Sequence, residues 1–171
     1  MRANPVANSL LRVGFREKAV GLTPLKVQKL LYFLHGWYLA ITGEVLVDEG
    51  FEKWQYGPVC RPVYDALKIY GSKPVDDYIR EIDPEHLDFT AFFVNPELKP
   101  RFDEILEAVW KRYSDYSAAQ LSTLTHLPDT PWSLTENREM IDNELIREHF
   151  VNSARENRAR AERTHQYTLA E

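Results

Sequence analysis

The segment from Leu22 to Tyr70 constrains the fold more than any other part of the chain. It opens with Thr23-Pro24, where a hydroxyl can cap free backbone amides and a proline can occupy the first helical position. Gly43 supplies a helix stop. Because the apolar residues between them cover more than one side of a helix, this segment predicts a central core helix. Those apolar residues are Val27, Leu30, Leu31, Phe33, Leu34, Trp37, Tyr38, Leu39 and Ile41.

The residues after this helix predict a short extended segment and then a second helix. Residues 51–56 alternate well enough for a strand, with Trp54 and Tyr56 on one side. Residues 45–47 can pair with that segment as a small hairpin. Gly57-Pro58-Val59 predicts the start of the second helix, which ends near Tyr70. Pro62 would then lie one turn inside this helix and tilt its first turn.

Capping and spacing patterns predict further helices on both sides of this segment. Residues 4–19 favour an amphipathic first helix, and Asp83-Pro84 predicts a helix start with Leu87, Phe92 and Phe93 to bury. Later starts are expected at Asn95-Pro96, at the capping box Ser117 to Gln120, and near Asp142. The expected fold is therefore mainly α: a single compact helical domain of six or seven helices, with a short β-hairpin or extended segment near residues 45–56.

Composition places the chain among ordinary globular domains. Its 171 residues suit one domain, and its net charge of −5 argues against nucleic acid as the main partner. The lone cysteine, Cys60, cannot form an internal disulfide, which favours a reducing compartment. No segment resembles a signal peptide or a membrane span. These features predict a cytoplasmic protein that is not associated with a membrane.

The chain lacks the usual patterns of cofactor and metal sites. Its five histidines form no metal-ligand spacing with one another or with Cys60, and no glycine-rich phosphate loop or calcium loop is present. His35, on the core helix, is expected to be a hydrogen-bonded, partly buried imidazole. We therefore expect no catalytic residue, no metal and no cofactor.

Cys60 is the one position whose neighbours in sequence suggest a reactive side chain. Arg61 and the start of the expected second helix would both lower the pKa of its thiol. With His126 as a base it could form a nucleophilic pair, although a packed thiol is the commoner situation. A small enzyme using Cys60 or His126 is thus an alternative, but our expectation is that the protein is not an enzyme.

Two blocks of sequence resemble a known family. The strings LTPLKVQKLLYFLHGWYLAITG, WQYGPV and VYDAL are similar to the Panacea domain of antitoxins and phage-associated proteins. Tyr116-Ser117-Ala118, Leu121-Ser122, Leu124-Thr125-His126 and Pro131-Trp132 resemble its second block. Arg61-Pro62 departs from the proline and acidic residue usual there. The resemblance implies a single Panacea-like domain over residues 1–151, leaving residues 152–171 as a polar helical extension or frayed tail.

The same resemblance implies a function. Such a protein is an antitoxin that neutralises a co-encoded toxin by direct binding, either blocking it or presenting it to a cytosolic protease. The expected partner-binding residues are Trp54, Tyr56, Arg61, Tyr64, His126 and Trp132, although these aromatic residues could equally wedge neighbouring segments onto the core.

Two other functions remain open at this point. One is a phage-associated protein that binds a host factor, and the other is a DNA-binding autorepressor. The second is disfavoured by the acidic net charge and by the lack of spare length for a separate DNA-binding region. The interrupted basic run of Arg155, Arg158, Arg160 and Arg163 fits an exposed helix face, or a contact for an acidic surface on a partner.

Overall fold

The computed structural model describes the backbone of residues 1–168 and the side chains of residues 1–163. Within that range the protein is mainly helical, as predicted, with seven α-helices and two short two-stranded antiparallel sheets. The helices are α1 (Ala3–Arg16), α2 (Pro24–Thr42), α3 (Arg61–Leu67), α4 (Phe102–Tyr113), α5 (Ala118–Thr125), α6 (Pro131–Leu134) and α7 (Asn143–Thr168), and a 3-10 turn, η1 (Lys68–Tyr70), follows α3. The sheets pair β1 (Glu52–Trp54) with β2 (Gly57–Val59) and β3 (Glu81–Ile82) with β4 (Phe89–Thr90).

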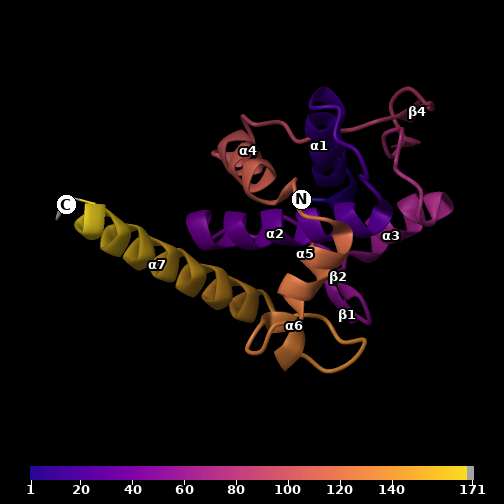
Figure 1. Ribbon diagram of the computed structural model, residues 1–171. Coiled ribbons are helices and arrows are strands. Elements are labelled where there is room, and N and C mark those ends of the chain that lie inside the picture. Colours follow the sequence, from indigo (N-terminus) through magenta and orange to yellow (C-terminus); the bar gives the residue numbers. More distant parts are fainter. Residues whose placement is uncertain (169–171) are drawn as a thin grey trace.

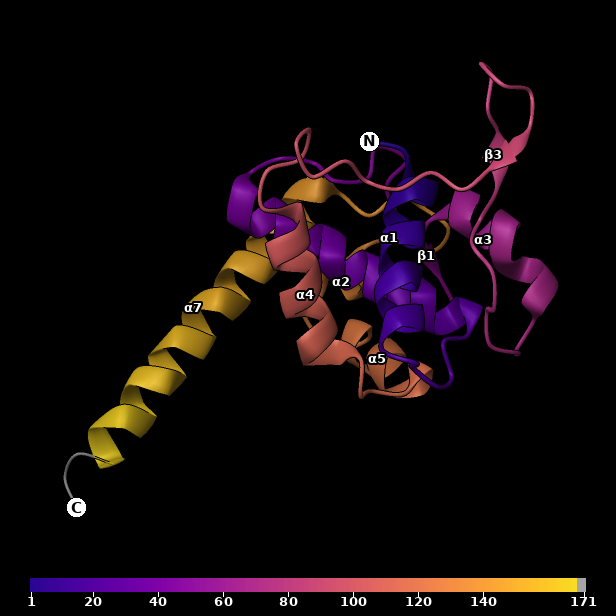
Figure 2. The same ribbon diagram turned by 90° about the horizontal axis from the view of Figure 1, so that it is seen from above.

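Helix α2 is the centre of the fold, and its predicted bounds are confirmed. The Thr23 hydroxyl accepts a hydrogen bond from the backbone N–H of Lys26, and Gly43 ends the helix in the left-handed conformation with a φ of 76°. The other helices gather around α2, with α1 and α4 over one side and α5 and α7 over the other (Figure 1). Most of its residues are buried, polar ones included. Figure 2 shows the same arrangement from above, with α1 crossing over α2.

Helix α7 begins where predicted, packs against α2 and then leaves the body of the molecule (Figure 1). The ring of Phe150 fills the space that a Cβ on Gly36 would occupy, and it lies 5.2 Å from the Trp37 ring. Beyond Ser153 every described side chain is exposed. The helix therefore continues as a polar extension as far as Thr168, and residues 169–171 lie outside the described residues.

The segment around Gly57 is a strand, so the prediction of a helix start there is wrong. β2 pairs with β1 in the register Glu52 with Val59, and residues 45–47 form no part of this hairpin. Gln28 on α2 accounts for the extended backbone. Its side chain accepts from the Cys60 N–H at 2.8 Å and donates to the Cys60 carbonyl at 3.0 Å. Helix α3 starts only at Arg61, so Pro62 lies in its first turn, where its missing N–H is harmless.

The helix predicted at Asp83-Pro84 is also absent, and the segment forms the β3–β4 hairpin. The Asp83 carboxylate accepts from the backbone N–H of Glu85 and from His86 Nδ1, which closes a turn. Leu87 adopts a φ of 55° and is largely exposed rather than buried. The local side-chain acceptor thus turns the chain back before a helix can form.

The remaining helix bounds differ from prediction in smaller ways. α1 ends at Arg16 rather than at residue 19. α4 starts at Phe102 instead of near Asn95, because Pro100 and the left-handed Arg101 interrupt the chain just before it. The predicted capping box of α5 is confirmed, since Ser117 and Gln120 each accept from the other's backbone N–H. None of the described helices is long and apolar enough to cross a membrane.

Candidate partner-binding surface

Strand β1 is held by hydrogen bonds along both of its edges. On one side it pairs with β2. On the other side the backbone of Lys53 pairs with residues 138–139. The Lys53 N–H donates to the Glu139 carbonyl at 2.9 Å, and the Lys53 carbonyl accepts from the Arg138 N–H at 3.1 Å. The Ile141 N–H also donates to the Phe51 carbonyl at 2.7 Å. The backbone groups of the strand are thus hydrogen-bonded on both of its edges.

Helices α5 and α6 fasten the turn that follows β1. The indole Nε1–H of Trp132 donates to the Trp54 carbonyl at 2.9 Å, and the Ser122 hydroxyl donates to the Tyr56 carbonyl at 2.8 Å. His126 Nε2 lies 3.0 Å from the Gln55 carbonyl. The His126 ring packs against Trp132 with centroids 3.7 Å apart. These contacts explain why His126 and Trp132 come next to the hairpin despite their distance in sequence.

A second group of side chains is organised by Glu52. Its carboxylate accepts from Arg61 Nε and Nη2 at 2.8 and 2.7 Å, and from the Trp54 indole N–H at 2.8 Å. The Arg61 hydrogen bonds lower the pKa of Glu52, which keeps it ionised. The Arg61 guanidinium lies 5.1 Å from the Trp54 ring centroid, and Tyr64 packs against that ring at 4.7 Å. Arg61, Tyr64 and Trp54 therefore form one cluster.

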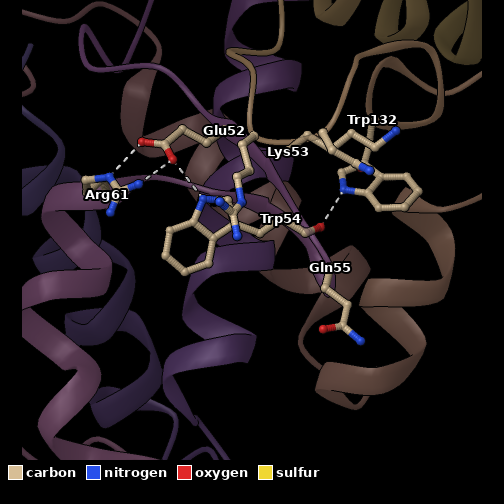
Figure 3. Close-up of a pocket in the computed structure, with 8 residues that line it drawn as sticks. Glu52, Lys53, Trp54, Gln55, Arg61 and Trp132 are labelled. Carbon is tan, nitrogen blue, oxygen red and sulfur yellow. Dashed lines mark hydrogen bonds and ion pairs between the residues drawn. The ribbon is translucent and has the colours of Figure 1, made fainter.

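A cavity of about 730 Å³ opens beside these two groups. Figure 3 shows Glu52, Arg61 and Trp54 toward one side of it, Trp132 toward the other and Lys53 between. The Lys53 ammonium lies 4.4 Å from the Trp132 ring centroid and donates to the Thr135 carbonyl at 2.6 Å. The full lining is Glu52, Lys53, Trp54, Gln55, Arg61, Trp132, Asn137 and Arg138. Two of these eight residues are aromatic, and three of the four charged ones are cationic.

A second hollow, of about 410 Å³, borders the same hairpin and includes Trp54, Tyr56 and Tyr64 in its lining. The Tyr56 side chain is 64% exposed. The structure thus brings together all six residues that the sequence singled out as a possible partner-binding set. Five of them, all but Tyr56, also make ring or cation contacts with one another, so these side chains have a structural role in the fold.

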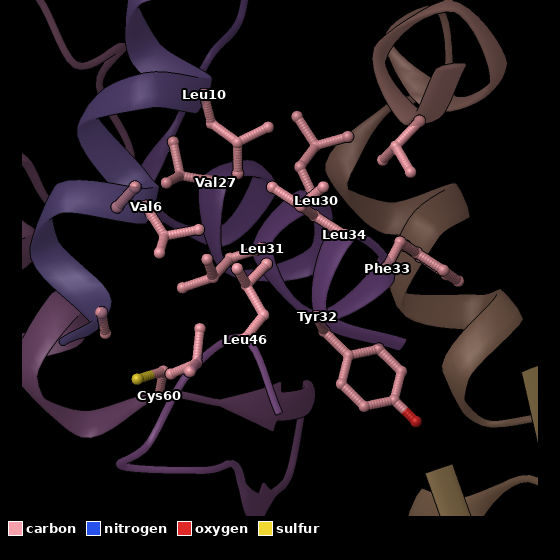
Figure 4. Close-up of a cluster of buried hydrophobic side chains, with 14 of the residues drawn as sticks. Val6, Leu10, Val27, Leu30, Leu31, Tyr32, Phe33, Leu34, Leu46 and Cys60 are labelled. Atoms are coloured by element: carbon pink, nitrogen blue, oxygen red, sulfur yellow. The ribbon is translucent and has the colours of Figure 1, made fainter. Parts of the chain in front are cut away.

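Cys60 does not have the reactive environment expected from its neighbours. Its side chain is fully buried in the hydrophobic cluster beneath α1 and α2 (Figure 4). Burial raises the pKa of the thiol to about 12, opposite to the direction predicted from Arg61 and the helix start. The guanidinium points instead to Glu52. Cys60 is thus a buried, packed thiol.

His35 is a structural residue, and it is more deeply buried than expected. Its Nε2 lies 2.9 Å from Asn143 Oδ1 and its Nδ1 accepts from the Val47 N–H at 3.2 Å. Burial lowers the pKa of this imidazole to about 4, so it is neutral at pH 7. His35 therefore links α2 to the start of α7. No group of three or more His, Cys, Asp or Glu in the described part of the chain is arranged to hold a metal ion.

Four residues at or beneath this surface escaped the sequence analysis: Glu52, Lys53 and Arg138, which line the cavity, and the buried Lys29. Lys29 is fully buried on α2, where its ammonium donates to the Pro58 carbonyl at 2.9 Å and packs against Gly57. Its signal was a lysine directly before the apolar run from Leu30 to Leu34 of the core helix. Lys53 offered a weaker signal as a cation between aromatic residues of an extended segment, and Glu52 and Arg138 offered none.

This geometry describes a class of protein: a small helical domain whose first hairpin carries an ordered surface of aromatic and cationic side chains. Comparison with known proteins gives the family. Residues 27–133, more than half of the chain, match the family described as antitoxin SocA-like, Panacea domain. Antitoxin SocA of Caulobacter vibrioides is 34% identical over 139 residues, which are 79% of this chain and 70% of that protein.

The chain therefore belongs to the SocA-like antitoxin family with a Panacea domain. No solved structure matches it. The matched region includes most of α2, both strands of the first hairpin, α5 and Trp132, so it contains all six residues of the predicted set.

Proposed function

We propose that this protein is an antitoxin that binds a co-encoded protein toxin directly and holds it inactive. The observation that carries the proposal is membership of the SocA-like antitoxin family, and the relative from Caulobacter vibrioides is itself named an antitoxin. The role is one of binding and not of catalysis. Its two routes are occlusion of the toxin and delivery of the bound toxin to a protease.

The toxin contacts the surface around β1, which we define by Trp54, Tyr56, Arg61, Tyr64, His126 and Trp132. Tryptophan, tyrosine and arginine are the residues most enriched at the energetic centres of protein interfaces. Trp54 lies on a strand that is hydrogen-bonded along both edges, and the other five residues surround it on the following turn and on or beside α3, α5 and α6. A surface that is already ordered loses little conformational entropy when a partner docks.

Co-expression with each neighbouring open reading frame tests the function. One neighbour should arrest growth alone, be rescued by this chain and co-purify with it. Rescue without a stable complex, lost in a protease-deficient strain, supports the delivery route. If no neighbour is toxic, the antitoxin proposal fails and the partner is to be sought among host factors.

Tyr56→Ala tests the surface within that assay. Because Tyr56 is 64% exposed, its removal should leave stability almost unchanged while weakening toxin binding about tenfold or more. Phe89→Ala is the matched control, since Phe89 is 68% exposed on the other hairpin. Equal binding by wild type and Tyr56→Ala, with the same toxin, would exclude Tyr56 from the interface.

A further inference from the structure

Two cations in the 730 Å³ cavity have no carboxylate partner. Lys53 and Arg138 both line the cavity, and neither forms an ion pair with any described side chain. The only carboxylate in the lining, Glu52, is already engaged by Arg61 and the Trp54 indole. Three cations and one carboxylate leave the cavity with a formal charge of +2.

This local charge has the opposite sign to that of the whole chain, which carries −5. Glu136 and Glu139 neighbour Arg138 in sequence but do not line the cavity. Cations that share a concave, partly apolar site reinforce one another, because field lines are focused where water is reduced. The cavity is therefore an anion-attracting point on an acidic protein.

We propose that this cavity receives an acidic side chain, Asp or Glu, from the toxin, with the carboxylate between Lys53 and Arg138. The inference rests on the proposed function and names the chemistry of the partner at this point of the interface. The amides of Gln55 and Asn137 supply further donors at the lining.

The arrangement of the aromatic rings favours a protein over a nucleotide. A nucleobase requires a free ring face for stacking. The Trp132 ring is already packed by His126 at 3.7 Å and lies 4.4 Å from the Lys53 ammonium. Trp54 is packed by Tyr64 at 4.7 Å and faces the Arg61 guanidinium at 5.1 Å. A carboxylate requires only the cations and no free ring face.

The four tryptophans of the chain provide a direct readout. A blocked tetrapeptide of alternating Asp and Glu is titrated into the ¹⁵N-labelled full chain at low salt. The titration is monitored by NMR through the indole N–H signals. Trp54 and Trp132 should shift saturably, whereas Trp37 and Trp110 lie outside the cavity lining and should not. The same peptide with Asn and Gln in place of the acids should produce no shift.

Charge variants test the roles of the two cations. Arg138→Gln and Lys53→Gln should each weaken binding of the acidic peptide by about tenfold. Arg138→Lys, which keeps the charge, should retain part of the affinity. Lys73→Gln is the matched control, because Lys73 is exposed and does not line the cavity. Shifts of all four indoles or of none, or a stronger response to ATP or to a short thymidine oligonucleotide, would overturn the inference.

The toxin complex separates this inference from the proposed function. If wild type rescues no neighbour, the antitoxin proposal fails whatever the peptide does. If wild type and Arg138→Glu both rescue growth and bind the toxin equally well, the inference about the cavity fails while the antitoxin proposal stands. The expected result is at least tenfold weaker toxin binding by Arg138→Glu, recovered by an acid-to-lysine change in the toxin.

Discussion

Helix α2 and the hairpin beside it are built by different kinds of interaction. Most of α2 is buried, and its apolar side chains meet α1, α4 and α7 (Figure 4). The β1–β2 hairpin is held largely by hydrogen bonds from side chains and backbone of distant segments. Such apolar packing contributes stability in proportion to area, whereas directed hydrogen bonds fix geometry. The core therefore supplies stability and the hairpin supplies a defined surface.

The largest expected effect lies on the α2 side of this comparison. Phe150→Ala removes a ring that is 2% exposed and packs over Gly36, Trp37 and Phe33. The lost burial and the cavity left behind should lower the free energy of unfolding by about 3–5 kcal/mol. Urea denaturation measures this loss. A loss below ~1 kcal/mol would mean that α7 contributes little to the core.

Lys29 joins the two regions, and its effect depends on pH. Burial lowers its pKa from 10.5 to about 7, so between those values the unfolded chain binds a proton that the folded chain does not. Stability should therefore rise with pH through this window, by about 2 kcal/mol between pH 7 and 9. Lys29→Met should lose this rise. Parallel stability profiles for the two proteins would show that the lysine remains charged in the fold.

Two tryptophan substitutions compare the hairpin with the core by the same chemical change, the loss of one indole N–H donor. Trp132→Phe removes the bond to the Trp54 carbonyl, and Trp37→Phe removes the bond to the Tyr113 hydroxyl. Each should cost about 1 kcal/mol in the free energy of unfolding. Only Trp132→Phe should weaken toxin binding. Equal binding losses in both variants would show that the hairpin surface is not distinct from the core in function.

The smallest effect is expected on the projecting part of α7. Arg158 pairs with Glu162 at 3.0 Å, four residues apart, and both side chains are exposed. Arg158→Gln should change the free energy of unfolding by less than about 0.5 kcal/mol. A larger loss, measured by thermal melting, would reveal that this part of α7 contributes to the core after all.

The sequence predicted the regions whose structure depends on neighbouring residues. The bounds of α2 follow from Thr23-Pro24 and Gly43, and the α5 cap follows from Ser117 and Gln120. Each of these signals lies within a turn of the residues that it controls.

The extended segment at residues 51–56 was predicted correctly, but the second strand of the hairpin was mispredicted because its determinants are remote. Gly57-Pro58-Val59 carries a plausible helix start, but Gln28 and Lys29 on α2 bind the backbone of residues 58–60 and keep it extended. Arg138 enters the cavity only because residues 138–141 pair with β1. The resemblance identified the aromatic residues of the surface, yet no local pattern could identify Arg138.

The span between Trp54 and Trp132 also has a consequence for synthesis. The hydrogen bond between them joins residues 78 apart, which at ~5–20 residues per second corresponds to roughly 4–16 seconds of translation. A nascent chain can form α2 well before α5, α6 and the 138–141 segment exist. The surface around β1 is thus completed late, and a prematurely terminated chain ending before Trp132 would lack the contacts that hold the turn after β1.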